Sequence, residues 1–225
     1  MTAAVPKAIL FDFDGVIVDS ESIHHRAYDI ALAAFGAGPV PFATYAEVFS
    51  NRSQGLDYIA RSFPGVDVAA VKRRKDELFL ELLREKGHLL PGVVDTLSAL
   101  SERWPLALAT GSSRAAAAII LERHGLAGRF RAVVGREDYP REKPAPDAFL
   151  RACDALGAGP DACLAVEDSY KGLTAARAGG ICCVVVPNDY TRAGDFTGAA
   201  AVLASLSELS VERAEAIYCG CREAR

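Results

Sequence analysis

The chain has 225 residues, of which 51% are hydrophobic, and its formal net charge is -4. This length and composition allow one large domain or two small ones around a buried core, and they argue against disorder. Because the two signs of charge are interspersed, no basic stripe is available to neutralise nucleic-acid phosphates, and we expect no nucleic-acid partner. No apolar run approaches the roughly 18 residues that cross a bilayer, so we expect no membrane association.

Short apolar runs alternate with helix-length segments along most of the chain. We predict strands at 8–13, 106–110, 132–135, 164–167 and 182–187. Wholly apolar strands that alternate with helices are typical of a parallel sheet buried on both faces and joined by right-handed crossovers. The segments 114–124, 145–156 and 171–178 carry apolar positions at helical spacing and each ends near a Gly. The pattern predicts an α/β fold with a doubly wound, Rossmann-like parallel sheet.

One helical insertion interrupts this alternation. Roughly 90 residues separate the first two predicted strands, far more than a single crossover helix needs. The segments 22–35, 45–50, 56–63 and 68–84 have helical patterns with almost no β-branched alternation between them. We therefore predict an α-helical cap at residues 17–90, inserted into an α/β core made of residues 1–16 and 91–225.

The N-terminal residues 1–6 are too short and too mixed in polarity for a signal peptide, so our working expectation is a cytoplasmic location. Four cysteines lie in apolar stretches, where a free Cys behaves as a small buried hydrophobe: Cys153, Cys163, Cys182 and Cys183. Cys219 and Cys221 flank Gly220 near the C-terminal end and have the chemistry to bind a metal or oxidise. Because no second Cys or His pair stands at zinc-site spacing, we favour a frayed chain end without an assigned role.

Two aspartates follow the first predicted strand. Asp12 and Asp14 are two positions apart, so in an extended chain both carboxylates project to one side, opposite Phe11 and Phe13. Two like charges this close require a cation between them, and hard oxygen ligands favour Mg²⁺. The alternative is an acidic turn, since Asp-Gly is common turn chemistry. A calcium loop is excluded, because Gly15 comes fourth in the motif and apolar residues follow it.

Polar residues also follow the second and third strands. Thr110, Gly111 and Ser112 open a helix, where backbone N–H groups and hydroxyls suit a phosphate; alternatively, Ser112 or Ser113 is simply the N-cap. Lys143 precedes a proline, which disfavours the helical region and holds Lys143 extended; the alternative is a solvated lysine.

Glu167 and Asp168 end the otherwise apolar fourth strand. Packing gives no reason for two adjacent carboxylates at this position, whereas a metal site does. In open α/β sheets the ligand lies beyond the carboxyl ends of the strands, and every polar group described so far falls at such an end. Their coincidence predicts one site for a metal and a phosphate.

In motif order and spacing the chain resembles the haloacid dehalogenase-like hydrolases over essentially its whole length. Phe11-Asp12-Phe13-Asp14-Gly15-Val16 is similar to the first motif of that family, Thr110 to the second, Lys143 to the third and Glu167-Asp168 to the fourth. The insertion resembles the cap of the subfamily that holds β-phosphoglucomutase, phosphoglycolate phosphatase and CbbY-type sugar-phosphate phosphatases.

The resemblance implies a role for each matching residue. Asp12 is expected to be the nucleophile that forms an aspartyl-phosphate, and Asp14 the acid that protonates the leaving oxygen and then activates the acceptor. Mg²⁺ is expected on the Asp12 carboxylate, the Asp14 carbonyl and Asp168, with Glu167 as a further ligand or beside one. The residues expected to hold the phosphoryl oxygens are Thr110, Lys143 and the amides of Gly111 and Ser112. Dehalogenation is not expected, because those relatives lack the second carboxylate of the first motif.

Three residues of the insertion fall where β-phosphoglucomutase-like proteins contact sugar or a distal phosphate: His24, Arg52 and Lys75. For Arg52 and Lys75 the alternative is a solvated charged face. His24 lies ten residues after Asp14 and therefore near the cleft. The asparagine that the mutase carries after its second motif is absent here, where Arg114 stands, and this favours hydrolysis.

We therefore expect a monomeric or homodimeric phosphatase of a small phosphorylated metabolite, such as a sugar phosphate or phosphoglycolate. A phosphomutase is the nearest alternative. A phospho-receiver module also combines carboxylates, Thr, Lys and Mg²⁺, but it lacks a long insertion and is phosphorylated on a different strand. A non-catalytic binding protein is disfavoured, because every polar residue that the mechanism requires is present.

Overall fold

The computed structural model describes residues 5–224. In this part of the chain a parallel sheet of six strands has the order β3-β2-β1-β4-β5-β6. The strands are β1 (Ala8–Phe11), β2 (Leu106–Ala109), β3 (Ala132–Val134), β4 (Cys163–Glu167), β5 (Cys182–Val185) and β6 (Ala201–Val202). The predicted parallel α/β architecture is confirmed, and β6 is an edge strand that was not predicted.

The helices account for most of the remaining chain. The α-helices are α1 (Glu21–Ala34), α2 (Phe42–Thr44), α3 (Gly55–Ser62), α4 (Val68–Lys86), α5 (Val93–Arg103), α6 (Arg114–Arg123), α7 (Asp147–Leu156), α8 (Tyr170–Ala178) and α9 (Val211–Glu223). A π-helical segment, Tyr45–Asn51, continues α2, and short 3-10 turns lie at Ala127–Arg129, Arg136–Asp138, Pro160–Ala162 and Leu206–Glu208. No described helix is both long enough and apolar enough to span a membrane.

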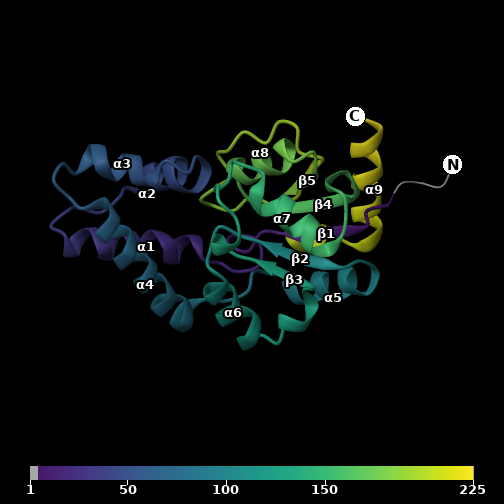
Figure 1. Ribbon diagram of the computed structural model, residues 1–225, viewed down its shortest axis with the longest axis horizontal. Coiled ribbons are helices and arrows are strands. Elements are labelled where there is room, and N and C mark those ends of the chain that lie inside the picture. Colours follow the sequence, from purple (N-terminus) through teal and green to yellow (C-terminus); the bar gives the residue numbers. More distant parts are fainter. Residues whose placement is uncertain (1–4, 225) are drawn as a thin grey trace.

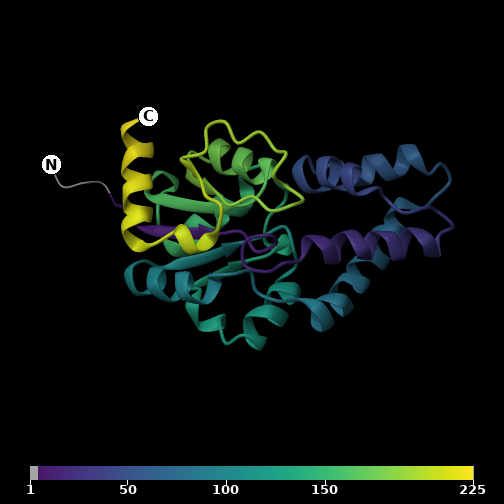
Figure 2. The same cartoon turned by 180° about the vertical axis from the view of Figure 1, so that it is seen from behind.

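Alternating residues of β1 explain why both faces of the sheet are covered. Ile9 and Phe11 are buried on the face of α5, α6 and α9, whereas Ala8 and Leu10 are buried on the face of α7 and α8. Figures 1 and 2 show α7 and α8 on one side of the sheet and α5 and α6 on the other. A strand that is apolar at every position is therefore buried at every position, as the sequence pattern predicts.

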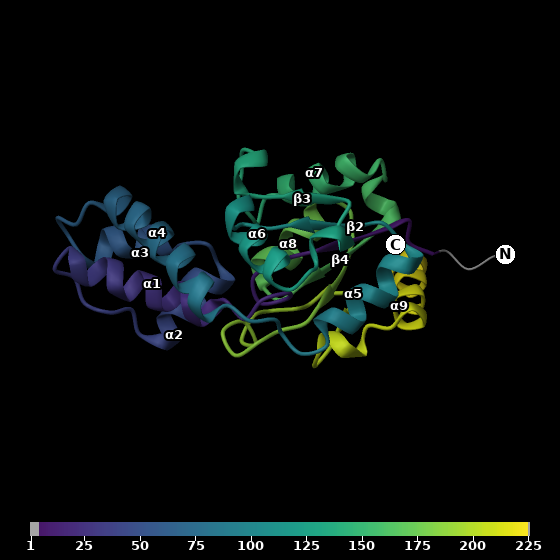
Figure 3. The ribbon, with the colours of Figure 1, turned by 90° about the horizontal axis from the view of Figure 1, so that it is seen from below.

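The helices α1 to α4 lie together to one side of the sheet (Figure 3). The chain enters and leaves this group along two neighbouring segments. Val18 and Leu89 form an antiparallel bridge, the N–H of Asp19 donates to the carbonyl of His88 at 3.0 Å, and Leu90 donates to Ile17 at 3.1 Å. The two chain segments that connect the helical insertion to the sheet are thus paired with each other.

The C-terminal region differs from the prediction. Cys182 and Cys221 form a disulfide between β5 and α9, so the expectation of a free Cys182 and a frayed end at Cys221 is wrong. Helix α9 places Ala214, Ile217 and Tyr218 in the core at helical spacing, and this packing orders the chain end. Cys153, Cys163 and Cys183 are free and buried as predicted, and Cys219 is free and half-buried.

Candidate active site

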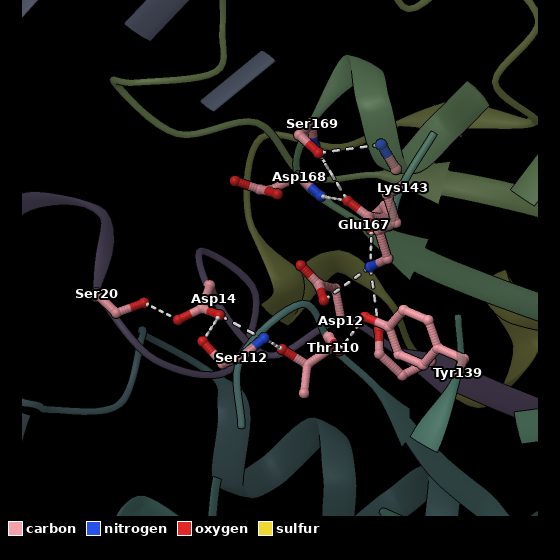
Figure 4. A network of polar contacts seen from close by, with 12 residues as sticks. Asp12, Asp14, Ser20, Thr110, Ser112, Tyr139, Lys143, Glu167, Asp168 and Ser169 are labelled. Atoms are coloured by element: carbon pink, nitrogen blue, oxygen red, sulfur yellow. Dashed lines mark hydrogen bonds and ion pairs between the residues drawn. The ribbon is translucent and has the colours of Figure 1, made fainter. Parts of the chain in front are cut away.

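The loop after β1 turns sharply instead of continuing as a strand. The carbonyl of Phe13 accepts hydrogen bonds from Ile17 at 2.9 Å and Val18 at 3.1 Å, and Gly15 adopts a positive φ of 73°. The predicted strand therefore ends at Phe11, two residues early, because the turn takes over the backbone hydrogen bonds. As a result Asp12 and Asp14 face different sets of partners (Figure 4).

Asp12 is paired with a buried lysine. The Nζ atom of Lys143 donates to Asp12 Oδ1 at 2.9 Å, to Glu167 Oε1 at 2.5 Å and to the carbonyl of Ala109 at 3.0 Å. The Lys143 side chain is only 5% exposed, so the alternative of a solvated lysine is wrong. Three segments, the ends of β1, β2 and β4, thus hold one ammonium group in place (Figure 4).

For both Lys143 and Asp12, burial and the charge of the other residue shift the pKa in opposite directions. Burial lowers the pKa of Lys143, but the Asp12 and Glu167 carboxylates outweigh it and leave the pKa well above its ordinary value. Burial raises the pKa of Asp12 to about 7, against the opposing effect of the Lys143 ammonium. The ammonium therefore stays charged, and Asp12 needs further positive charge to be fully ionised at neutral pH.

Asp12, Glu167 and Asp168 form a buried acidic cluster, with one ligand atom of each lying within 4.8 Å of the others. Burial, and next the Glu167 carboxylate, raise the pKa of Asp168 well above its ordinary value. When all three are ionised, the single ammonium of Lys143 leaves two negative charges uncompensated. Hard carboxylate oxygens with this charge deficit fit a divalent cation such as Mg²⁺.

Glu167 is occupied on both of its oxygens. Oε1 accepts from Lys143, while Oε2 accepts from the N–H of Asp168 at 3.1 Å and from the hydroxyl of Ser169 at 3.1 Å. Its side chain is fully buried. These contacts place Glu167 behind Asp12 and Lys143, where it fixes the lysine and the start of α8.

Asp14 lies among donors rather than among carboxylates. Oδ1 accepts from the Ser20 hydroxyl at 2.6 Å and lies 3.2 Å from His24 Nε2, and Oδ2 accepts from the Ser112 hydroxyl at 2.6 Å. Burial alone raises the pKa of Asp14, but the charge and hydrogen bond of His24 and the two serine hydroxyls outweigh it and lower the pKa below its ordinary value. Without a substrate, Asp14 is therefore ionised and available to accept a proton.

The turn after β2 presents hydrogen-bond donors to the cavity. Thr110 is fully buried, and its hydroxyl accepts from the N–H of Ser112 at 2.9 Å. Ser113 is the N-cap of α6, since its hydroxyl accepts from Ala116, and this leaves the Ser112 hydroxyl for Asp14. A side chain at Gly111 would meet nothing within 4 Å, so this backbone stays open to a bound group.

A cavity of about 370 Å³ lies between the loops of the sheet and the helical insertion. Most of the residues predicted for the site line it: Asp12, Asp14, His24, Lys75, Gly111, Ser112, Lys143 and Asp168. Thr110 and Glu167 are buried directly behind this lining, in contact with Asp14 and Lys143. The structure thus brings the four sequence motifs together at the carboxyl edge of the sheet.

Lys75 and His24 form the wall opposite Asp12. His24 stacks on Phe79, with ring centroids 3.7 Å apart, and Lys75 Nζ lies over the rings of Phe79 and Tyr28 at 5.0 and 5.2 Å. Burial lowers the pKa of both His24 and Lys75. Lys75 is 8% exposed, so it is no solvated surface residue, and its ion pair with Asp76 is 3.4 Å long. Among the described residues, Asp76 is thus the one carboxylate that forms an ion pair with this buried cation.

Arg52 is placed differently from the other predicted contacts. Its side chain is 58% exposed, pairs with Glu47 at 2.6 Å and does not line the cavity. The alternative of a solvated charged residue describes Arg52 in this conformation. A substrate contact by Arg52 therefore stays a prediction.

Several site residues were not predicted. Lys171 lines the cavity and donates to the carbonyl of Phe49 at 3.1 Å, and the Ser53 hydroxyl donates to the carbonyl of Lys143 at 3.0 Å. Asn51, also in the insertion, donates to the carbonyl of Tyr190 at 3.3 Å. These three bonds connect the insertion to the sheet side of the cavity. For Lys171 the signal was its place in the first turn of α8, shortly after the fourth motif.

Comparison with known proteins gives one family. A sequence model of the haloacid dehalogenase-like hydrolases matches residues 6–180. The chain is similar to Protein CbbY of Rhodobacter capsulatus, at 33% identity over 86% of this chain and 90% of that protein. It is also similar to fructose-1-phosphate phosphatase YqaB of Escherichia coli strain K12, at 33% identity over 77% and 92% of the two chains.

A solved structure agrees with these relatives. The structure of a mutant CbbY from Rhodobacter sphaeroides in complex with xylulose-1,5-bisphosphate superposes with a TM-score of 0.81 and 29% identity, covering 91% of this chain and 96% of that one. The fold, the four motifs and the similarity over most of both chains agree with one another. This chain belongs to the haloacid dehalogenase-like hydrolases, in the group that includes CbbY, phosphoglycolate phosphatases and β-phosphoglucomutases.

Proposed function

We propose that this hydrolase is a Mg²⁺-dependent phosphatase of small phosphorylated metabolites that works through an aspartyl-phosphate on Asp12. The observation that carries the proposal is the environment of Asp12, which lines the cavity beside Lys143 and two further carboxylates. A nucleophilic carboxylate next to a fixed cation is what covalent phosphoryl transfer requires.

The proposed reaction has two steps, and Asp12 and Asp14 take part in both. An Asp12 oxygen attacks phosphorus, the bond from phosphorus to the leaving oxygen breaks, and Asp14 gives that oxygen a proton. Asp14 can take this proton from solvent when a phosphate dianion enters the cavity, because a nearby negative charge raises a carboxyl pKa. Asp14 then accepts a proton from water, which attacks phosphorus and releases Asp12 and inorganic phosphate.

The cation would be held by carboxylate oxygens of Asp12 and Asp168 and by the Asp14 carbonyl, with Glu167 beside them. When bound, Mg²⁺ supplies positive charge that offsets the charge of the phosphoryl group and of the acidic cluster. Lys143, Thr110 and the backbone N–H groups of Gly111 and Ser112 would supply the remaining contacts to the phosphoryl oxygens.

The wall opposite Asp12 supports a substrate with a second polar or anionic end. Lys75 is a buried cation whose only described carboxylate partner, Asp76, is half exposed, and Lys72 and Lys171 also line the cavity. The related CbbY binds a sugar bisphosphate, and the related YqaB is named for a sugar monophosphate. Selection of the substrate by the helical insertion, as a cap, is part of this proposal.

A phosphomutase is the second candidate. The two activities differ in whether water or a second sugar hydroxyl attacks the aspartyl-phosphate. Lys171 donates to Phe49, Asn51 donates to Tyr190 and Ser53 donates to Lys143, so these bonds join the insertion to the sheet side beside the cavity. A mutase must exclude water from its phosphoenzyme, whereas a phosphatase must admit it. We favour hydrolysis because the turn after Thr110 lacks the asparagine of the mutase.

The test is phosphate release across a panel of sugar phosphates, sugar bisphosphates and phosphoglycolate at saturating Mg²⁺. A parallel reaction with β-glucose 1-phosphate and a trace of glucose 1,6-bisphosphate measures glucose 6-phosphate. We expect phosphate release at an enzymatic rate without isomer. Isomer formation far faster than phosphate release on every panel substrate would replace the phosphatase by the mutase.

Asp14→Asn is expected to slow hydrolysis of alkyl phosphates far more than hydrolysis of an activated aryl phosphate, whose leaving group needs little protonation. The loss on alkyl phosphates should be on the order of a hundredfold or more, the range for general acid catalysis. The measurement is kcat on both substrate types for the variant and the wild type. Equal losses on both types would remove Asp14 from the acid role.

Lys143→Ala is expected to lower kcat by on the order of a hundredfold or more, the range for loss of one fixed electrostatic contact. Because Lys143 pairs with two buried carboxylates, we also expect the free energy of unfolding to fall by about 3 to 5 kcal/mol. Chemical denaturation and steady-state kinetics measure the two effects. Lys7→Ala, at an exposed lysine, is the control, and a Lys143 variant with control-like kinetics would contradict the assignment.

The cytoplasmic location stays a prediction. Disulfides are rare in cytosolic proteins, and the Cys182–Cys221 disulfide therefore differs from what that location leads one to expect.

A further inference from the structure

The loop after β5 reaches the acidic cluster through the side-chain amide of Asn188. Asn188 Nδ2 donates to Asp168 Oδ2 at 2.8 Å. The two residues come from neighbouring strands, because β5 pairs with β4 up to Val185 and Glu167, and the N–H of Val186 then donates to the carbonyl of Glu167 at 2.7 Å. Sheet pairing thus fixes the distance between this loop and the end of β4.

The surrounding loop fixes which way the amide faces. The N–H of Tyr190 donates to Asn188 Oδ1 at 2.9 Å, and only the oxygen of an amide accepts a backbone N–H. The NH₂ group must therefore face Asp168. The N–H of Asn188 donates to the hydroxyl of the fully buried Thr191 at 3.0 Å, and the carbonyl of Asn188 accepts from the N–H of Thr191 at 3.1 Å. These two bonds between Asn188 and Thr191 hold the backbone of the loop in a tight turn.

Gly15 leaves the space for this bond. A Cβ atom at Gly15 would lie 2.3 Å from Asp168 Oδ2 and 2.6 Å from Asn188 Nδ2. Both distances are shorter than a Cβ atom and an oxygen or nitrogen atom can adopt without a clash. The glycine of the first motif is therefore required by its positive φ of 73° and also by the contact between Asp168 and Asn188.

We propose that Asn188 is a positioning residue that holds Asp168 Oδ2, so that the other oxygen of the same carboxylate is presented to the cation. The inference rests on the proposed Mg²⁺ site. A carboxylate free to rotate must be fixed when the cation binds, which costs binding free energy, whereas one held in advance does not. Partners that orient a metal ligand in this way typically contribute about 10-fold to 100-fold in metal affinity.

The test uses Mg²⁺ alone, in calorimetric titrations of the metal-free protein. Asn188→Ala is expected to raise the Mg²⁺ dissociation constant by about 10-fold to 100-fold. kcat at saturating Mg²⁺ is expected to stay close to the wild-type value, because Asn188 touches neither phosphate nor Asp12. Asn188 also borders a separate cavity of about 550 Å³, so water can fill the space left by the truncation. The melting temperature without metal should therefore change little.

Three further variants separate loss of the Asn188 hydrogen bond from other effects of substitution in this loop. Asp189→Ala, at the exposed neighbour in the same loop, should leave the dissociation constant unchanged. Asn188→Leu keeps the side-chain size without a donor and should match Asn188→Ala, which keeps the test available if the alanine variant does not fold. Asp168→Asn marks the full loss of the site.

The outcomes distinguish this inference from the proposed function. Wild-type affinity in both Asn188 variants, together with loss of binding in Asp168→Asn, overturns the positioning role alone. Absence of Mg²⁺ binding by the wild-type protein overturns both the positioning role and the proposed metal site. Weaker binding in both Asn188 variants with an unchanged Asp189→Ala supports the inference.

Discussion

Asp12→Asn is expected to abolish phosphate release, with a loss on the order of 10⁴-fold or more, while the protein stays folded. An amide is no usable nucleophile, but its oxygen can still accept the hydrogen bond from Lys143. The substitution also removes one of three crowded carboxylates, so the free energy of unfolding should not decrease. The measurements are phosphate release and chemical denaturation of the same preparation.

Asp95→Asn is the matched control for this substitution, because Asp95 is exposed on α5 and does not line the cavity. It should retain wild-type turnover. A folded Asp12→Asn protein with turnover similar to the control would contradict the nucleophile assignment. It would leave the sheet, the cavity and the family membership unaffected.

Removal of divalent metal is expected to reduce turnover as much as Asp12→Asn does. Chelation by EDTA should abolish turnover, and added Mg²⁺ should restore it. The reason is charge: Asp12, Glu167 and Asp168 offer three carboxylates to one ammonium, and a phosphate dianion would add to the excess. Burial already raises the pKa of Asp12 to about 7, and a cation beside it favours the ionised nucleophile.

The control for metal removal is circular dichroism of the chelated protein, which should retain its helical signal, because the core is built from apolar residues on both sheet faces. Loss of activity together with loss of structure would indicate a structural rather than a catalytic cation. Full activity in metal-free buffer would rule out the proposed mechanism.

The sheet and the position of the site could be predicted because one physical rule links them. Strands that are apolar at every position form a parallel sheet, and the carboxyl ends of parallel strands meet at one edge. Asp12, Thr110 and Asp168 each follow such a strand, so their proximity follows from the strand pattern alone. The motif spacing then separated this site from a calcium loop.

The partners inside the site could not be predicted, because they depend on side-chain packing between distant segments. The sequence predicted Lys143 as a phosphate ligand but gave no sign that Glu167 would fix its ammonium. Arg52 and Lys75 looked alike as charged residues of the insertion, yet Lys75 is buried over Phe79 and Arg52 pairs with Glu47 in solvent. Only the fold of the insertion separates the two.

The C-terminal region carries a helical pattern of apolar residues that the prediction of a frayed end did not take into account. Ala214, Ile217, Tyr218 and Cys221 recur at helical spacing and pack on the core. A frayed end was expected because no second Cys or His pair stands at zinc-site spacing from Cys219 and Cys221. Tertiary packing and the disulfide to Cys182 order this chain end instead.

The most direct test of the central claim is detection of phosphate on Asp12 itself. The wild-type protein would be mixed with Mg²⁺ and its best panel substrate, quenched in acid within one turnover and analysed by intact mass and peptide mapping. The proposed mechanism predicts one added phosphoryl group, located on Asp12, that disappears as substrate is exhausted and is absent from Asp12→Asn. Phosphate release at full rate with no phosphorylated chain at any quench time, or with the phosphoryl group on another residue, would contradict it.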